Sequence, residues 1–345
     1  MDDLKFLPFY ERLTIRFPGY IIGKVLVSAL LGLAFLAAHY VSIGNEVFED
    51  WSWFLSALIS TAMLCLYYAT HTLRIILPEM DMRLRPDGDE VYMTPLKRIL
   101  SDRNFILAGF FFGLLNCGFA YGFGLPYSKG LAVVTILSGY FLAGFVCGMA
   151  VFGIYGVSVS ISAFSREAKR SLDFTSPDCC GGTLFLGEAL VVFSSVTLIV
   201  GVMISVYVLK ADWTRDNTSW IILLKCFWIV FPYLMSLVAL IAPAVPINNE
   251  LREYKMEQEV VLQRRLTKIR KRLEDNNLDA AARKDLRETY EFHKSVRKDL
   301  HRMRTWPYGL GANLKYFAVV VANLFASIDT ASAWMNKYFP GGAGQ

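Results

Sequence analysis

The sequence predicts an all-α, polytopic helical membrane protein, and three observations support this fold class. Hydrophobic residues make up 54% of the 345-residue chain. They gather in long runs that can each cross a bilayer, whereas soluble proteins use short periodic segments. The longest interval without such a run, from Ile247 to Trp306, contains no glycine or proline and is rich in charge. We therefore expect six transmembrane helices, a cytoplasmic helical hairpin, and a C-terminal interfacial or re-entrant helix.

Each expected span meets the length of about 20 residues that a helix needs to cross the hydrocarbon core. The spans are Tyr20–Ser42, Trp53–Leu77, Asn104–Leu125, Leu131–Ser162, Thr183–Leu209 and Trp220–Val245. The predicted organisation is a six-helix transmembrane domain at residues 1–246, a hairpin at 247–305 and a membrane-associated segment at 306–345. No removable signal peptide is expected, because the first apolar run is too long for one.

The segments that flank the spans alternate between high and low numbers of Lys and Arg. The N-terminal segment, the second and fourth loops and everything after Pro246 are basic. The first loop has no Lys or Arg, the third has Lys129 alone, and the fifth has Lys210 and Arg215. Because basic segments favour the cytoplasmic side, we expect the hairpin and both termini in the cytoplasm.

The charged interval predicts two helices, at Asn248–Glu274 and Leu278–Arg304, with Asn277 as the N-cap of the second. Residues 247–304 contain 16 Lys and Arg and 11 Asp and Glu, a net charge of +5. Heptad-like seams occur in both helices: Leu262, Leu266, Ile269 and Leu273 in the first, and Ala282, Leu286, His293, Val296, Leu300 and Met303 in the second. Facing seams predict an antiparallel hairpin. Because the seams are thin, we expect a homo-oligomer or a soluble cytoplasmic partner.

One stretch of the hairpin, RRLTKIRKR, is strongly basic and contains no acidic residue. Its charged residues are Arg264, Arg265, Lys268, Arg270, Lys271 and Arg272. They form either a solvated helix face or a contact with anionic lipid headgroups or an anionic ligand. Nucleic acid is not expected as a partner, because no aromatic residues alternate with the basic ones.

The C-terminal segment has an apolar core, Tyr316–Ile328, that is shorter than a span and is followed by Asp329. This favours an interfacial or re-entrant helix, or one packed beneath the bundle, over a seventh span. If the segment did cross, the final GGAGQ would lie outside the cell.

The spans hold few groups that could carry out chemistry. The sequence has no HExxH, GxSxG or P-loop motif, and the adjacent Cys179 and Cys180 lack the spacing of metal ligands. We therefore expect no enzyme, metal or cofactor. His71 and Glu188 are predicted at a similar cytoplasmic depth and could pair, although each could equally extend to the headgroups.

Glycines recur at intervals of three to five residues in the third and fourth spans. Such spacing allows two helix backbones to approach closely, which predicts tight packing of these spans against each other. Asn116 lies in the middle of the third span, and the fourth ends in a serine-rich stretch that includes Ser158 and Ser162. These hydroxyls could line a wet vestibule or simply bond to the helix backbone.

The sixth span contains Lys225, Pro232 and Pro243, and then continues into the hairpin. Lys225 could extend to the headgroups or face an aqueous cavity. Proline removes a backbone hydrogen bond and favours a kink. The leading hypothesis is an oligomeric channel whose sixth span is hinged at the prolines and driven by the hairpin. The alternatives are a non-conducting scaffold or signalling protein that docks a soluble partner, and a secondary transporter.

Overall fold

The structure is a computed structural model, and most of the residues it describes are helical and none lies in a strand. Between them they cover nearly the whole chain. The described residues are 8–15, 20–49, 51–82, 101–125, 130–168, 172–211, 213, 219–274 and 279–338.

Among the described residues, six helices are long and apolar enough to cross a membrane, as expected of a multi-pass membrane protein. They are α2 (Tyr20–Ile43), α3 (Ser52–Met82), α5 (Asp102–Phe123), α6 (Leu131–Ala168), α7 (Leu184–Lys210) and α8 (Ser219–Leu273). The other elements are α1 (Phe9–Ile15), the 3₁₀ helix η2 (Gly44–Phe48), α9 (Ala280–Arg302) and α10 (Leu310–Tyr338). The prediction of an all-α membrane protein with six span-length apolar helices is confirmed for the described residues.

Helix α8 differs from the prediction because it joins two expected elements into one helix of 55 residues. It contains the sixth span and the first helix of the hairpin, without a break at Pro243 or Pro246. Helix α9 then returns toward the bundle, and Asp279 occupies its N-cap position. Asn277, the expected cap, lies outside the described residues. We call residues 247–273 of α8, together with α9, the arm.

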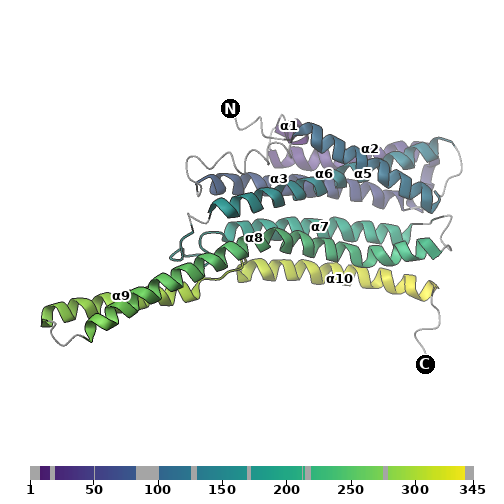
Figure 1. Cartoon of the computed structure of the whole chain (residues 1–345). Helices are drawn as coiled ribbons and strands as arrows, with labels where there is room; N and C mark the ends of the chain where they lie inside the picture. Colours follow the sequence, from purple (N-terminus) through teal and green to yellow (C-terminus); the bar gives the residue numbers. More distant parts are fainter. Residues whose placement is uncertain are drawn as a thin grey trace, which may run out of the picture.

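The bundle consists of two groups of helices (Figure 1). One group contains α2, α3, α5 and α6, with the short α1 at one end, and the other contains α7, α8 and α10. Contacts of α3 with α7 and of α6 with α8 join the groups. The arm projects from one end of the bundle, which we call the arm end, and we call the opposite end the distal end.

Helices α5 and α6 pack closely through glycines, as predicted. An added methyl group on Gly109 or Gly113 of α5 would lie within 3 Å of Phe145 or Phe141 of α6. From the other side, Gly144 and Gly148 lie against the backbone and side chain of Phe112. Each helix therefore supplies small residues where the other supplies a ring.

Candidate functional site

Pro232 of α8 is held by two residues of α7. A methyl group on Gly201 would lie 2.7 Å from the Pro232 ring, so the two helices touch at this position. Pro232 has no N–H, and this leaves the carbonyl of Trp228, one turn earlier, without its helical donor. The Ser205 hydroxyl of α7 donates to that carbonyl. Pro232 therefore packs α8 closely against α7. The buried Trp228 carbonyl, which loses its helical donor, is satisfied by the Ser205 hydroxyl instead.

A second polar contact joins α7, α8 and α10 in the middle of the bundle. The hydroxyl of Ser194 donates to the Ser236 carbonyl at 2.6 Å, and the hydroxyl of Ser236 contacts the Ser194 carbonyl at 2.9 Å. The Tyr316 hydroxyl of α10 lies 2.9 Å from the Ser236 hydroxyl. Both serines are fully buried, so these bonds form in an apolar environment that does not supply competing water.

At the arm end, the chain that leaves α9 packs directly against α7. An added methyl group on Gly187 would lie only 1.4 Å from the Pro307 carbonyl oxygen, so only glycine fits here. The next residue, Tyr308, donates its hydroxyl to the carbonyl of Leu240 in α8. The buried Pro243 lies one turn further along the same helix. Segment 303–309 is therefore fixed to both α7 and α8.

The loop between α6 and α7, residues 172–183, is organised around Asp178. Its carboxylate accepts hydrogen bonds from the backbone N–H groups of Cys180, Gly182 and Leu184. Burial of Asp178 raises its pKa, but these bonds outweigh that effect and hold the pKa below its ordinary value. The adjacent Cys180 thiol is buried and contacts the Trp306 carbonyl, and burial raises its pKa to about 11.

This loop also supports the base of the arm. The backbone N–H of Arg304 donates to the Cys179 carbonyl at 2.7 Å. Gly181 lies against the side chains of Met303 and Leu251. Lys255 of α8 donates to the carbonyls of His301 and Met303, at the C-terminal end of α9, where a cation is favourable. We call residues 247–255, 303–309 and the 172–183 loop the root of the arm.

Burial along the arm decreases from the root to the tip. At the root, Leu251, Leu300 and Met303 are at most 3% exposed, whereas Leu286 and Leu273 near the tip are only half-buried. Between the root and the tip, the carboxylate of Glu259 lies 3.7 Å from the side chains of both Arg297 and His301. Leu262 and Leu300, one from each expected seam, belong to one buried cluster, whereas Ala282 of the second seam is exposed. The outer part of the arm therefore depends on weak contacts.

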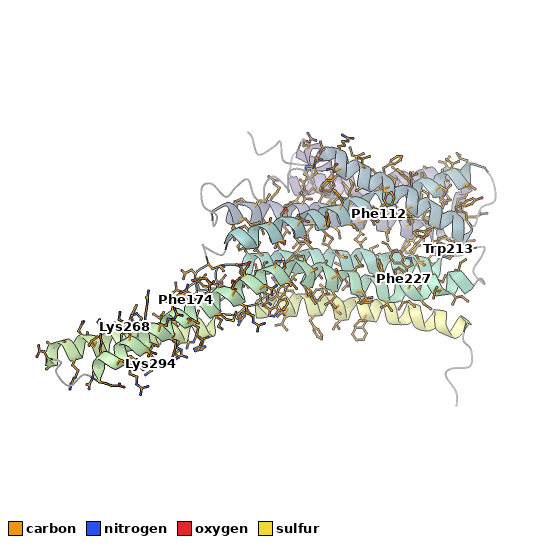
Figure 2. All side chains as sticks on the ribbon, viewed as in Figure 1. Phe112, Phe174, Trp213, Phe227, Lys268 and Lys294 are labelled. Carbon is orange, nitrogen blue, oxygen red and sulfur yellow. The ribbon has the colours of Figure 1, made fainter. Side chains whose placement is uncertain are left out.

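All six residues of the predicted basic cluster, Arg264 to Arg272, are exposed on the outer part of the arm. At 1.5 Å per residue, they lie about 27–39 Å along α8 from Pro246. Figure 2 shows Lys268 and Lys294 pointing away from the arm, with side-chain nitrogens concentrated there, whereas the bundle carries mostly carbon. The helix thus carries the cluster away from the bundle.

The structure also places the other residues that the sequence suggested for a pore or gate. Asn116 donates to the Tyr140 carbonyl across the α5–α6 contact at 2.7 Å. Ser158 donates to the Ile154 carbonyl within α6, as the backbone-bonding interpretation expects, and Ser162 is half-buried. Lys225 is 2% exposed, so its side chain is buried within the protein.

The outward face of the membrane part of α8 is apolar. Its exposed large side chains are Leu223, Phe227, Val230, Leu234, Leu237, Val238, Ile241 and Val245. This composition suits contact with lipid acyl chains.

His71 and Glu188 are both exposed, on the adjacent helices α3 and α7. Their shared depth and their pairing stay predictions.

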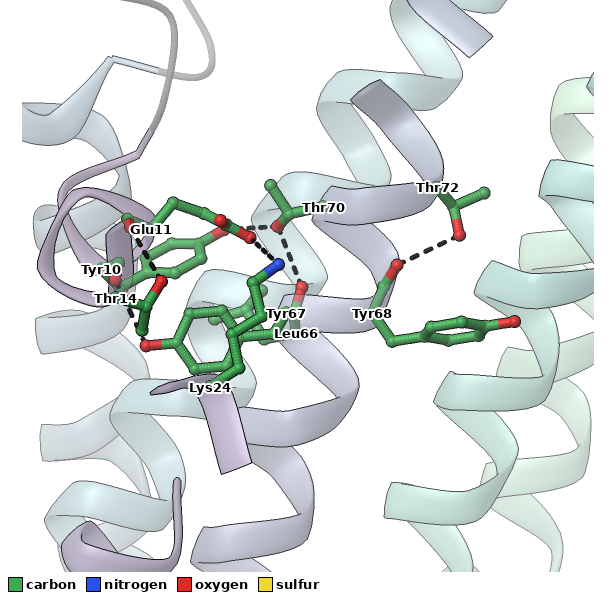
Figure 3. Close-up of polar contacts among 9 residues, drawn as sticks. All are labelled: Tyr10, Glu11, Thr14, Lys24, Leu66, Tyr67, Tyr68, Thr70 and Thr72. Atoms are coloured by element: carbon green, nitrogen blue, oxygen red, sulfur yellow. Dashed lines mark hydrogen bonds and ion pairs between the residues drawn. The ribbon is translucent and has the colours of Figure 1, made fainter. Parts of the chain in front are cut away.

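The N-terminal helix α1 is inserted into the arm end of the first helix group (Figure 3). The fully buried Glu11 accepts a hydrogen bond from the Lys24 ammonium group of α2 at 2.8 Å. The Tyr10 hydroxyl lies 2.9 Å from the Thr70 hydroxyl of α3, and Tyr67 of α3 donates to the Tyr10 carbonyl. This site was not predicted from the sequence, because the N-terminal segment was considered only as a basic segment that flanks the first span.

The serine contacts of α7 and α8 were also missed, since an isolated serine in a span gives no pattern. One signal was available in the sequence: Gly201 and Ser205 are four residues apart, so they lie on the same face of α7. In the structure, this face packs against Pro232 of α8. Comparisons with known proteins supply no further guide, because no protein-family model, curated protein or solved structure matches the chain.

Proposed function

We propose that the protein is a membrane scaffold that holds a rigid helical arm in the cytoplasm, where the outer part of the arm docks an acidic soluble protein. The observation that carries this proposal is the continuity of α8 from the membrane into the arm, together with the packing of the root. Motion of the arm relative to the bundle would have to break the Arg304–Cys179 and Lys255–Met303 contacts and separate Gly187 from Pro307.

The charge of the outer arm supports a partner with an acidic surface. The basic cluster lies about 27–39 Å beyond the membrane end of α8, which is several Debye lengths at physiological ionic strength. Headgroups of the same membrane are therefore poorly placed to bind it, whereas a soluble acidic protein can approach it directly. A partner, or a second copy of the chain, would also stabilise the arm by covering the half-buried seam near its tip.

The orientation follows from the loop charges, which assign α1 and the arm to the cytoplasm. In agreement, Arg12, Arg74 and Arg103 are exposed at the arm end and Glu46 and Glu49 at the distal end. The assignment of the C terminus to the cytoplasm holds only if α10 does not cross the membrane.

A channel is the second candidate, because α8 combines internal prolines with direct continuity into the arm. The scaffold accounts better for the same helix, since Pro232 is packed against Gly201 and the outward face of α8 is apolar. Homo-oligomer formation is compatible with either function and can be measured by the mass of the purified protein in detergent.

Site-specific photo-crosslinking of the full chain in its native membranes tests the proposal. A crosslinking amino acid at Lys268, on the basic face, should give one defined adduct with an acidic protein. The same amino acid at Leu262, which faces α9, is the matched control and should give none. Reversing the cluster with Arg264→Glu and Lys268→Glu should abolish the adduct. Absence of any adduct from the exposed positions, together with ion conductance of the purified protein in planar bilayers, would overturn the scaffold in favour of the channel.

A further inference from the structure

Helix α10 is much longer than the apolar core of the C-terminal segment. It contains 29 residues, which corresponds to about 43 Å, whereas the hydrocarbon core of a bilayer is about 30 Å thick. The expectation of an interfacial or re-entrant helix depended on the 13 residues from Tyr316 to Ile328. The helix continues through Asp329 and ends only at Tyr338.

The path of α10 follows that of α7, which is a membrane-crossing helix of 27 residues. At the arm end, Pro307 and Gly309 lie beside Gly187 and Leu184, at the start of α7. One to two turns further along, Tyr316 reaches Ser236, which is bonded to Ser194 of α7. The two helices therefore leave the arm end together and run in the same direction. Figure 1 shows α10 lying along α7 and α8 as far as the distal end.

Apart from Asn313 and Lys315 near its start, the exposed face of α10 is apolar where its side chains are described. Leu314, Phe317, Leu324 and Phe325 are between 42% and 71% exposed. The side-chain amide of Asn323 donates one hydrogen bond to the Val319 carbonyl within the helix, which satisfies one of its two N–H donors. This face continues the apolar surface of the bundle to which α7 and α8 belong, and acyl chains are the occupant that suits it.

The charges of α10 are spaced as in a crossing helix. Lys315 and Lys337 enclose 21 residues, or about 32 Å, and Asp329 is the single charge between them. Asp329 lies about 12 Å from Lys337 along the helix, toward the distal end. Trp334 and Tyr338 follow it, and such residues are typical of a membrane–water interface.

We propose that α10 is a seventh membrane-crossing helix whose outward face contacts lipid acyl chains, so that the C terminus lies on the opposite side of the membrane from α1 and the arm. The arm is then connected at both of its ends to crossing helices, α8 before it and α10 after it. An interfacial or re-entrant helix would instead return the C terminus to the arm side. This proposal is independent of whether the arm docks a partner.

Labelling of single introduced cysteines with a membrane-impermeant maleimide tests the proposal on the full chain. The background protein carries Cys179→Ser and Cys226→Ser, because these two native thiols are exposed. One cysteine is appended after Gln345, and two reference variants carry Lys268→Cys on the arm and Asn45→Cys at the distal end. The appended cysteine should be labelled from the same side as Asn45→Cys, at least ten-fold faster than from the side that labels Lys268→Cys.

Labelling of the appended cysteine from the arm side would overturn the proposal, as would equal labelling from both sides. A protease-cleavable tag fused after Gln345 provides a second measurement that requires no substitution within a helix. Cleavage of this tag by protease added to the arm side alone would likewise overturn the proposal that α10 crosses the membrane.

Discussion

The two helix groups of the bundle are held together by different chemistry. In the first, α5 and α6 interlock through glycines and phenylalanine rings, and α1 is held by a buried ion pair. In the second, hydroxyl groups of Ser194, Ser205 and Tyr308 donate to main-chain carbonyls of α8. Glycine contacts allow close approach, whereas hydrogen bonds to particular carbonyls also fix the register of one helix along another. The group that carries the arm has three such bonds to α8, and the bond from Asn116 to the Tyr140 carbonyl does the same between α5 and α6.

The largest expected effect lies in the first group, at the buried ion pair. Glu11→Gln leaves the Lys24 ammonium group buried without this counter-charge, which should destabilise the protein by about 3–5 kcal/mol. The matched control is Glu274→Gln, which removes the exposed pair with Arg270 and should cost at most about 1 kcal/mol. Thermal unfolding of both variants in detergent checks this difference, and equal effects would contradict the assignment of Glu11 to a buried site.

Next in size is the contact between the root and α7. Gly187→Ala places a methyl group on the Pro307 carbonyl, and such overpacking should cost about 1–3 kcal/mol or more because the opposing atom is backbone. Gly118→Ala on α5, which meets nothing within 4 Å, is the control and should be neutral or slightly stabilising. Hydrogen exchange should increase in residues 303–309 of Gly187→Ala. Unchanged exchange there would show that the root is not held by this contact.

The role of Ser205 can be separated from general packing by a double-mutant cycle with Pro232. Ser205→Ala leaves the Trp228 carbonyl unsatisfied and should cost about 1–3 kcal/mol. In a Pro232→Ala background, residue 232 supplies its own N–H to that carbonyl, so the same substitution should cost at least about 1 kcal/mol less. Equal costs in both backgrounds would mean that Ser205 does not compensate for the proline.

The smallest effect is expected at Asp178. Because its pKa is lowered in the folded protein, its carboxylate stabilises the loop above the ordinary pKa of about 4, and this stabilisation is lost as the pH falls through the lowered value. Asp178→Asn should therefore increase the exchange of the Cys180, Gly182 and Leu184 amides at pH 7 and remove the pH dependence below pH 5. A variant that kept the full pH dependence would exclude Asp178 as its source.

The sequence predicted much of this fold because its strongest signals are local. Apolar runs of adequate length specify the six spans, and glycine spacing predicts the α5–α6 contact. The individual contacts that hold the helices and the arm in place were not predictable in this way. The partners Ser205 and Trp228, Gly187 and Pro307, and Glu11 and Lys24 are brought together by tertiary packing, and a single serine, glycine or glutamate has no distinctive pattern. The length of α10 was underestimated because Asp329 interrupts the hydropathy of the segment but not its helix.

The distance between the arm and the bundle tests the account most directly. Spin labels at Lys268→Cys on the arm and Arg103→Cys at the start of α5 can be measured by pulsed dipolar spectroscopy in lipid nanodiscs, with Cys179 and Cys226 replaced by serine. A rigidly mounted arm predicts a single narrow distance distribution, which should broaden when Gly187→Ala is added. Two populations, or one broad distribution in the parent protein, would contradict a fixed arm and favour a moving element.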